Sequence, residues 1–371
     1  MTEAAGHDRR LVVWLSLAQL ITWGSVFYTF ALLLEPVEQA LGMTRAQSSL
    51  AFSLALLAEG LCAYPVGRWI DRGHERAVMT GGSLLLAAGL ILHSQVHSIA
   101  GFYGVWTLLG AALAATLYTP VFAVVTRRFP HDFRRAIITL TFLGGLASTV
   151  FIPLSAWLIG HWGWRTALVA LALLHLLVCA PLHATCLRDA PPAAPARGAG
   201  GQSPADLLRS APFLLIGVFA IGMMAVTAAI PPHLISLLRE SGIGPAWVIA
   251  IPASIGVIQV LGRLLLYVFE HRFDVHMANR LVPFLIPAGL LALLAGAAHP
   301  AAGLLFVLLY GLGNGMNTIV KGTAIAQYVS RTHVASLNGV LGLPRAVARA
   351  LAPLALGLLW TPAVGYRWGL L

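Results

Sequence analysis

Five side chains that are charged at neutral pH lie well inside long apolar stretches of this sequence. One is a carboxylate and four are basic: Glu59, Arg263, Lys321, Arg345 and Arg349. A charged side chain at the centre of a bilayer costs about 2.5–3.5 kcal/mol on insertion scales, so each of these groups should face a partner or a polar cavity. The excess of basic groups favours an anionic ligand, and the carboxylate is a group that can take up and release a proton.

Lys321 ends a row of four polar residues with a helical spacing. Tyr310, Asn314, Asn317 and Lys321 follow one another at intervals of four, three and four residues, which places them on one face of a helix. We expect this face to bind substrate. In the alternative interpretation, the asparagines bond to neighbouring helices and the lysine extends toward the aqueous boundary.

The arginines and Glu59 allow similar pairs of interpretations. Arg345 and Arg349 lie one helical turn apart between two prolines. We expect Arg349 to bind an anion or to act in gating; the alternative is a structural pairing with backbone carbonyls or an acid. We expect Arg263 to contact substrate; the alternative is a side chain that extends to the aqueous boundary. Glu59 is expected to carry a coupling proton or to form a gate salt bridge with Arg345 or Arg349.

Weaker candidates lie in other apolar stretches. Gln19, Trp23, Tyr28 and Tyr118 are candidate cavity residues, with simple packing as the alternative. His233 is expected to be an interfacial histidine with satisfied hydrogen bonds, and a pH-sensitive gate is the alternative.

The composition places the chain in a membrane. Hydrophobic residues make up 58% of the sequence and charged residues 10%, against about 25% charged residues in soluble domains. The net charge of +10 does not indicate nucleic-acid binding, because the arginines occupy short turns between apolar stretches. The sequence shows no phosphate-binding loop, catalytic triad or metal-ligand spacing, so we expect no cofactor, no metal and no enzyme activity.

The apolar stretches are long enough to cross a bilayer, which takes about 20 residues, and they should be helical. The sequence predicts eleven membrane-spanning helices, at about 11–35, 46–66, 77–96, 99–127, 136–160, 166–187, 210–237, 246–269, 281–298, 301–329 and 337–361. Basic residues favour one side of these helices roughly fourfold, which predicts a cytoplasmic N-terminus.

Two halves are indicated by a linker and by short repeated sequences. Residues 188–208 are rich in Ala, Pro and Gly and read as a cytoplasmic linker between domains at 1–187 and 209–371. Gly67-Arg68 is echoed by Gly262-Arg263, and Gly163-Trp164-Arg165 by Gly365-Tyr366-Arg367. We therefore predict an all-α membrane protein of two pseudo-symmetric six-helix bundles, of which the second lacks its twelfth helix.

A charged turn connects the second and third predicted helices. Gly67, Asp71, Arg72 and Arg76 match the pattern Gly-x-x-x-Asp-Arg-x-Gly-Arg-Arg, while His74 and Glu75 depart from it. In this turn and in its overall plan, the chain resembles the major facilitator superfamily. The resemblance implies that the four matching residues act as a conformational latch, and that the first, fourth, seventh and tenth helices line a central cavity.

A narrower resemblance is to monocarboxylate-porter-like members, which carry Asp-x-x-x-Arg in the eighth helix. Here the pattern is Gln259-x-x-x-Arg263, so the arginine is kept and the acid is not. The resemblance implies a monomeric secondary transporter of the inner (plasma) membrane. It would move a small organic anion by alternating access, with proton coupling or exchange. An exporter of drugs or hydrophobic compounds is the alternative, followed by a membrane sensor that transports nothing.

Overall fold

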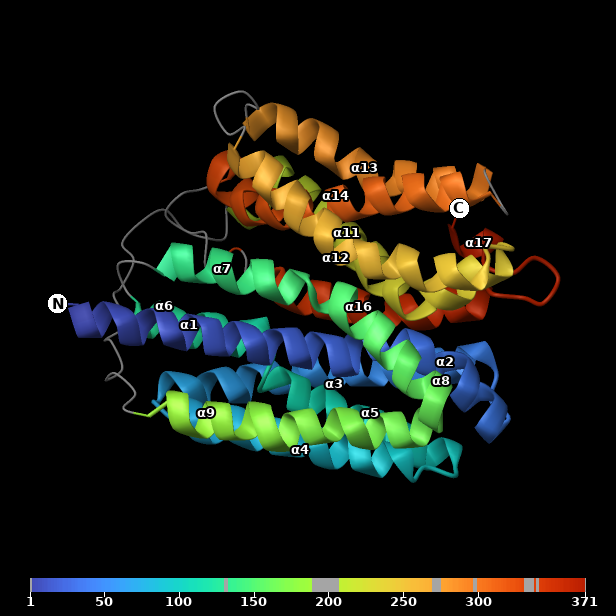
Figure 1. The fold of residues 1–371 in the computed structure, drawn as a ribbon. Helices are drawn as coiled ribbons and strands as arrows, with labels where there is room; N and C mark the ends of the chain where they lie inside the picture. The colour runs from blue at the N-terminus through green and yellow to red at the C-terminus, as the bar shows by residue number, and fades with distance from the viewer. Residues whose placement is uncertain are drawn as a thin grey trace. The chain divides into compact units, whose positions relative to one another are not determined.

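The computed structural model describes residues 2–129, 133–188, 207–268, 275–295, 299–329, 337 and 340–370. Some side chains within these ranges are not described, including those of Asp71 and Lys321. All the named elements in the described ranges are helices (Figure 1). The predicted all-α class is therefore confirmed.

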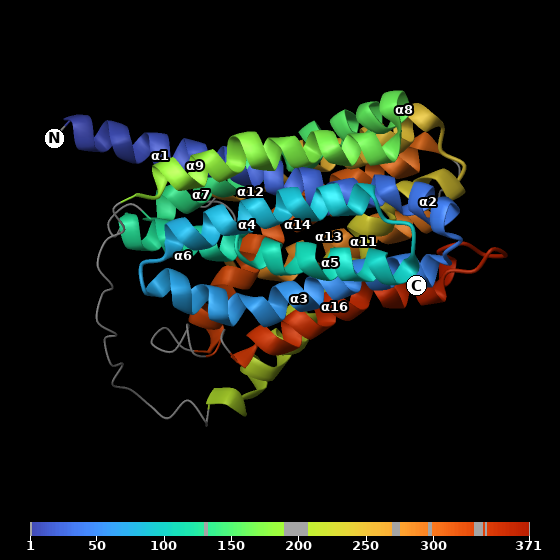
Figure 2. The ribbon, with the colours of Figure 1, turned by 90° about the horizontal axis from the view of Figure 1, so that it is seen from below.

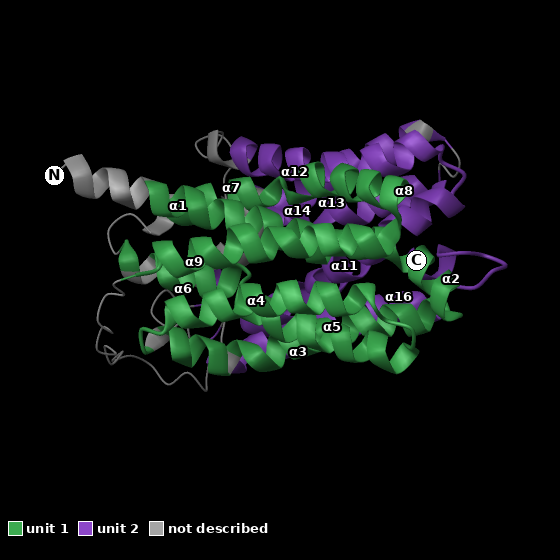
Figure 3. Cartoon of the chain, turned by 60° about the horizontal axis from the view of Figure 1, so that its bottom comes forward, with its two compact units in different colours: residues 1–194 green, residues 195–371 purple. Residues whose placement is uncertain are grey.

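The chain forms two compact units, residues 1–194 and 195–371 (Figure 3). Unit 1 contains α1 (Thr2–Thr22), η1 (Trp23–Tyr28), α2 (Thr29–Leu41), α3 (Arg45–Asp71), α4 (Glu75–Ser94), α5 (Ile99–Ala114), α6 (Tyr118–Arg128), α7 (Phe133–Gly145), α8 (Ala147–Leu174), η2 (His175–Cys179) and α9 (Ala180–Cys186). Unit 2 contains α11 (Ala211–Glu240), α12 (Pro245–Val268), α13 (Val275–Ala295), α14 (Pro300–Tyr328), α16 (Gly342–Leu359) and α17 (Arg367–Leu370). Most of the predicted linker, 188–208, lies outside the described residues, so the predicted domain borders stay a prediction.

Eight helical segments in the described ranges are long and apolar enough to cross a membrane. One of them, Thr139–Cys186, covers two predicted helices, and the backbone breaks between these two at Gly163, which has a φ of 77°. Two shorter apolar helices, Arg280–Ala295 and Ala301–Asn317, lie within the remaining two predicted segments. Each segment predicted from the sequence is thus largely helical where it is described, and the predicted helix 99–127 is broken at residues 115–117 into α5 and α6.

Helix ends follow local sequence signals. Thr44 caps α3: its hydroxyl accepts a hydrogen bond from the Gln47 N–H, and the Gln47 side chain accepts one from the Thr44 N–H. Gly42, two residues before this cap, takes a left-handed φ of 63° that ends α2. Gly163 and Gly365, the echoed glycines of the two halves, also have positive φ values, of 77° and 57°.

Two membrane-spanning helices contain a π-helical turn, an arrangement frequently found at functional sites. These turns, η1 and η2, are joined by a hydrogen bond of 2.7 Å between Ser25 Oγ and His175 Nε2. Ser25 donates its own hydrogen to the Ile21 carbonyl, at 2.6 Å, so His175 Nε2 must be the donor. His175 Nε2 thus has a hydrogen-bond partner within unit 1, which fits a structural role for this histidine.

The same order of helix pairs recurs in both units. The second and fourth helices pack together in unit 1, as α3 with α5 (Figure 2). The corresponding helices of unit 2, α12 and α14, also pack together. In each pair a glycine lies where the two helix backbones come close together. A side chain on Gly110 would overlap the backbone of Ala55, and one on Gly315 would overlap the backbone of Gln259. Small residues at such crossings let helix backbones approach closely.

The close contact of α12 and α14 at Gly315 predicts that Gly315→Ala destabilises unit 2. The new methyl group meets backbone and not a flexible side chain, so the free energy of unfolding should fall by about 1–3 kcal/mol. Thermal unfolding of the purified protein in detergent measures the change. Gly222→Ala in α11, where nothing lies within 4 Å of the added methyl group, is the matched control and should be nearly neutral. Equal stability of the two variants would contradict the close approach.

Candidate functional site

A pair of amide side chains lies at the crossing of α12 and α14. Asn314 Nδ2 donates to Gln259 Oε1 at 3.2 Å. Gln259 is 4% exposed and stands where the monocarboxylate-porter-like pattern has an acid. The approach at Gly315 brings the backbones near enough for this bond to form between neutral groups.

Asn317 and Tyr310 are buried on the same helix as Asn314. Each is 1% exposed, and the Tyr310 ring packs on Phe306 with 5.2 Å between ring centroids. Neither amide atom of Asn317 has a hydrogen-bond partner in the described part of the chain. A buried amide with an unused donor and acceptor is unusual, because buried polar groups are normally paired. The Lys321 side chain, predicted to complete this row, lies outside the described residues.

Three predicted arginines are half-buried in membrane-spanning helices of unit 2. Arg263 lies in α12, and Arg345 and Arg349 lie one turn apart in α16. Among the described helices of unit 2 the single acidic residue is Glu240, at the C-terminal end of α11. Its carboxylate accepts a hydrogen bond from Trp360 Nε1 at 2.8 Å. The apolar part of unit 2 therefore carries a net positive charge.

Glu59 is half-buried near the middle of α3 in unit 1. Its predicted partners, Arg345 and Arg349, belong to unit 2. The gate salt bridge and the proton-coupling role of Glu59 both stay predictions.

The predicted latch residues lie at the junction of α3 and α4. Arg76 Nε donates to the Ala184 carbonyl at the end of α9, at 2.7 Å. Arg72 is exposed and Gly67 is half-buried with open space around its Cα, while the Asp71 side chain lies outside the described residues. Of the four predicted latch residues, Arg76 is thus hydrogen-bonded to the end of α9.

A buried ion pair beside this turn was not predicted. Arg128 Nε, at the end of α6, donates to Glu75 Oε1 at 2.6 Å, and Arg128 Nη2 donates to the Arg188 carbonyl at 2.9 Å. The Glu75 side chain is 0% exposed. The signal was present in the sequence: Glu75 replaces an arginine of the family pattern, and Arg128 belongs to a basic stretch with no other obvious partner.

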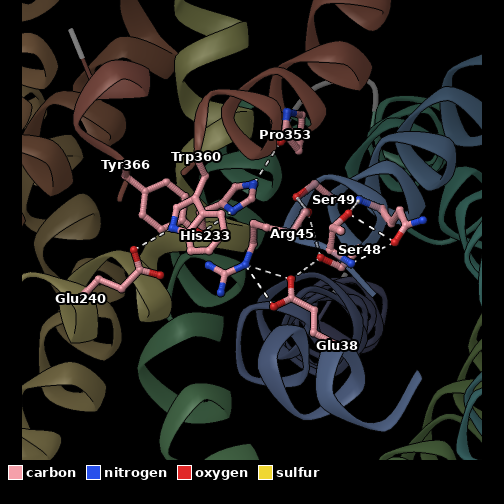
Figure 4. A network of polar contacts seen from close by, with 11 residues as sticks. Glu38, Arg45, Ser48, Ser49, His233, Glu240, Pro353, Trp360 and Tyr366 are labelled. Atoms are coloured by element: carbon pink, nitrogen blue, oxygen red, sulfur yellow. Dashed lines mark hydrogen bonds and ion pairs between the residues drawn. The ribbon is translucent and has the colours of Figure 1, made fainter. Parts of the chain in front are cut away.

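His233 in α11 is held on both ring nitrogens (Figure 4). A carbonyl can only accept, so Nε2 donates to the Pro353 carbonyl, at 3.0 Å, and Nδ1 accepts from the Tyr366 hydroxyl, at 2.9 Å. The histidine therefore joins α11 to α16 as a neutral group with satisfied hydrogen bonds, the role expected first.

Figure 4 also shows a polar cluster of unit 1, in which Arg45 Nε donates to Glu38 Oε1 at 2.9 Å.

In unit 1, Gln19 and Trp23 lie one turn apart beside a break between α5 and α6. The break frees the Thr116 carbonyl, which accepts a hydrogen bond from Gln19 Nε2 at 2.5 Å. Trp23 packs on Tyr118, the first residue of α6, with 5.3 Å between ring centroids. These weaker sequence candidates are thus brought together within one unit.

The described helices, with polar and charged groups buried among long apolar segments, have the composition of a membrane protein with several spans. The family profile described as Major Facilitator Superfamily matches residues 15–369. The chain belongs to this superfamily, and it is a transporter with multiple membrane-spanning helices rather than an enzyme.

Individual proteins show the same likeness. Monocarboxylate transporter 13 of Bos taurus is 30% identical over 298 residues, which cover 76% of this chain and 68% of the relative. The 2-nitroimidazole transporter of Escherichia coli is 28% identical over 193 residues, which cover 50% of this chain and 46% of the relative. The crystal structure of the nucleoside transporter NupG superposes with a TM-score of 0.70 at 16% identity, over 98% of this chain and 94% of that one. This last likeness concerns the fold.

The buried ion pair predicts an asymmetric effect of mutation. Arg128→Gln should destabilise the protein by about 3–5 kcal/mol, because it removes the partner of a buried carboxylate. Combining it with Glu75→Gln should restore part of that loss, since the charge that needs compensation is then gone. Unfolding free energies of both single variants and the double variant test this, with Arg72→Gln as an exposed control. Purely additive losses would contradict the pairing.

Proposed function

We propose that this chain is a secondary active transporter of a small organic anion, such as a monocarboxylate. It works by alternating access, with proton coupling or anion exchange. The observation that carries the proposal is the basic excess of unit 2, where Arg263, Arg345 and Arg349 are half-buried in apolar helices.

Charge balance is the reason for preferring an anion. Keeping basic groups inside a membrane is costly, and such residues mark substrate or ion pathways in transporters. Arginine suits a carboxylate because its guanidinium can donate two parallel hydrogen bonds. The only acid in the described helices of unit 2 is Glu240, at the C-terminal end of α11, so the residues of these helices are basic in excess. An anionic substrate is the kind of ligand that a basic excess favours.

The neutral polar groups of unit 2 supply hydrogen bonds of the kind that orient a substrate. Asn317 offers an unused donor and acceptor among the described residues, and Lys321 continues its row in the sequence. Tyr310 and Asn314 support this face, and the bond from Asn314 to Gln259 fixes its position.

Coupling is assigned to unit 1 in this proposal. The eighth helix has Gln259 and not an acid, so a proton cannot be carried there by a carboxylate. Glu59 lies near the middle of a membrane-spanning helix, and in this proposal it is either the proton carrier or a gate partner of Arg345 or Arg349. Exchange of one anion for another needs no such group.

The match to monocarboxylate transporter 13 extends over most of this chain, and it supports the proposal that the substrate is an organic anion. The match to the 2-nitroimidazole transporter, which covers half of this chain, favours the alternative, an exporter of drugs or hydrophobic compounds. We place the protein in the plasma membrane as a monomer with a cytoplasmic N-terminus. Gly67, Asp71, Arg72 and Arg76 then act as a latch between conformations.

The anion proposal predicts that Arg349→Ala and Lys321→Ala each raise the KM for anion uptake. Loss of a charge-assisted hydrogen bond is worth about 1.5–3 kcal/mol, which corresponds to a change of roughly tenfold to a hundredfold. Uptake of radiolabelled pyruvate into proteoliposomes measures this effect.

Arg280→Ala is the matched control, because Arg280 is an exposed arginine at the start of the apolar part of α13. Its KM should stay at the wild-type value. Unchanged anion transport in both Arg349→Ala and Lys321→Ala would show that the substrate is not recognised as an anion by these groups.

A further inference from the structure

Unit 1 holds an aromatic cluster made by Trp23, Phe27, Tyr118 and Phe122. Trp23 contacts Phe27 edge-on, with 4.9 Å between centroids, and it contacts Tyr118 at 5.3 Å. Tyr118 and Phe122 stack with centroids 5.2 Å apart and an interplanar angle of 19°. The cluster joins the π-helical turn η1 to the first turn of α6.

Partial exposure distinguishes this aromatic cluster from the packed core of the same unit. Core rings such as Phe30, Phe52 and Trp106 are 1% exposed. Trp23, Tyr118 and Phe122 are instead half-buried. Part of each of these three rings is thus accessible, and a further aromatic group that reached them would add the edge or stacking contacts that aromatic rings favour.

Two polar atoms at the cluster lack partners in the part of the chain that the structure describes. Gln19 is 0% exposed; its Nε2 is bonded to the Thr116 carbonyl, while its Oε1 has no hydrogen-bond donor. Trp23 Nε1, one turn further along the same helix face, has no acceptor. Buried polar atoms without a partner are rare in folded proteins, and such an atom is a place where a ligand gains by binding.

We propose that the aromatic cluster binds the ring of an aryl carboxylate that carries a hydroxyl group on the ring. This rests on the proposed function and narrows its substrate class from small monocarboxylates to aromatic ones. A phenolic hydroxyl can donate to Gln19 Oε1 and accept from Trp23 Nε1–H at the same time. The ring itself packs on Trp23 and Tyr118.

Gly144 in α7 sets the position of Tyr118. A side chain on Gly144 would overlap the Tyr118 hydroxyl, so the tyrosine ring lies directly against the helix backbone. A single added methyl group at this glycine must displace the ring. The aromatic cluster can therefore be disturbed without changing any of its members.

The test compares the binding of propanoate, 3-phenylpropanoate and 3-(4-hydroxyphenyl)propanoate to the full-length protein by isothermal titration calorimetry. We expect the phenyl group to lower the Kd about tenfold and the hydroxyl to lower it by a further factor of roughly five to ten, which correspond to about one good contact each. Trp23→Phe keeps a ring but removes the N–H. In this variant the hydroxylated acid should bind no more tightly than 3-phenylpropanoate, while 3-phenylpropanoate should still bind more tightly than propanoate. Trp157→Phe, which alters a half-exposed tryptophan of α8 outside the cluster, should leave all three constants unchanged.

Gly144→Ala should weaken both aryl acids several-fold and leave propanoate unchanged. Gly160→Ala, where nothing lies within 4 Å of the added methyl group, is its control and should alter none of the constants. Thermal unfolding of each variant shows whether it is folded. A folded Trp23→Phe protein that retains the hydroxyl advantage overturns the proposal.

Pyruvate uptake into proteoliposomes separates this proposal from the proposed function. If pyruvate is transported but the aryl acids bind no better than propanoate, the aryl site is wrong and anion transport stands. If the aryl acids bind through the cluster but no carboxylate is transported, the aryl site stands and anion transport is wrong. If no carboxylate binds or is transported, both are wrong.

Discussion

The structure depends on one constraint: a polar group within an apolar helix must find its partner inside the protein. His233 meets it with the Pro353 carbonyl and the Tyr366 hydroxyl, and His175 meets it at Nε2 with Ser25. Glu75 meets it with Arg128. Each bond joins helices far apart in the sequence, so pairing polar groups also fixes which helices pack together. Gln19 Oε1 and the Asn317 amide are among the buried polar atoms that have no partner in the described residues, and the proposals above use them as places for a ligand.

Glycine makes this pairing possible in both units. Where Gly315 meets Gln259, and where Gly110 meets Ala55, the helix backbones come close enough to fix the side chains around them. In unit 2 this produces the bond from Asn314 to Gln259, a neutral contact at a position where the related pattern has an acid. The charge of unit 2 then comes from its arginines alone along the apolar length, which is why the proposal assigns anion recognition there and coupling to Glu59 in unit 1.

The sequence was sufficient to predict the helical class, the apolar segments and the superfamily, because these depend on composition, segment length and a short local motif. Glu75 in place of a basic residue was a sign that this side chain needs a partner, but the sequence could not identify Arg128, because the contact joins α4 to α6 and follows from packing rather than spacing. The π-helical turns were missed for a similar reason: nothing in the sequence around Ser25 or His175 separates them from ordinary α-helix. His233 was expected to have satisfied hydrogen bonds, but its partners, Pro353 and Tyr366, are set by the tertiary fold. The predicted roles of Lys321, Arg349 and Glu59 stay predictions.

Counterflow in proteoliposomes tests the central claim, transport of organic anions, most directly. Vesicles loaded with unlabelled pyruvate, and in a second series with 3-phenylpropanoate, are diluted into a trace of the same labelled acid without any ion gradient. Alternating access predicts that the label transiently accumulates inside above its external concentration for at least one of the two acids. Entry of both labels at the rate of protein-free vesicles, with no overshoot, would contradict the claim.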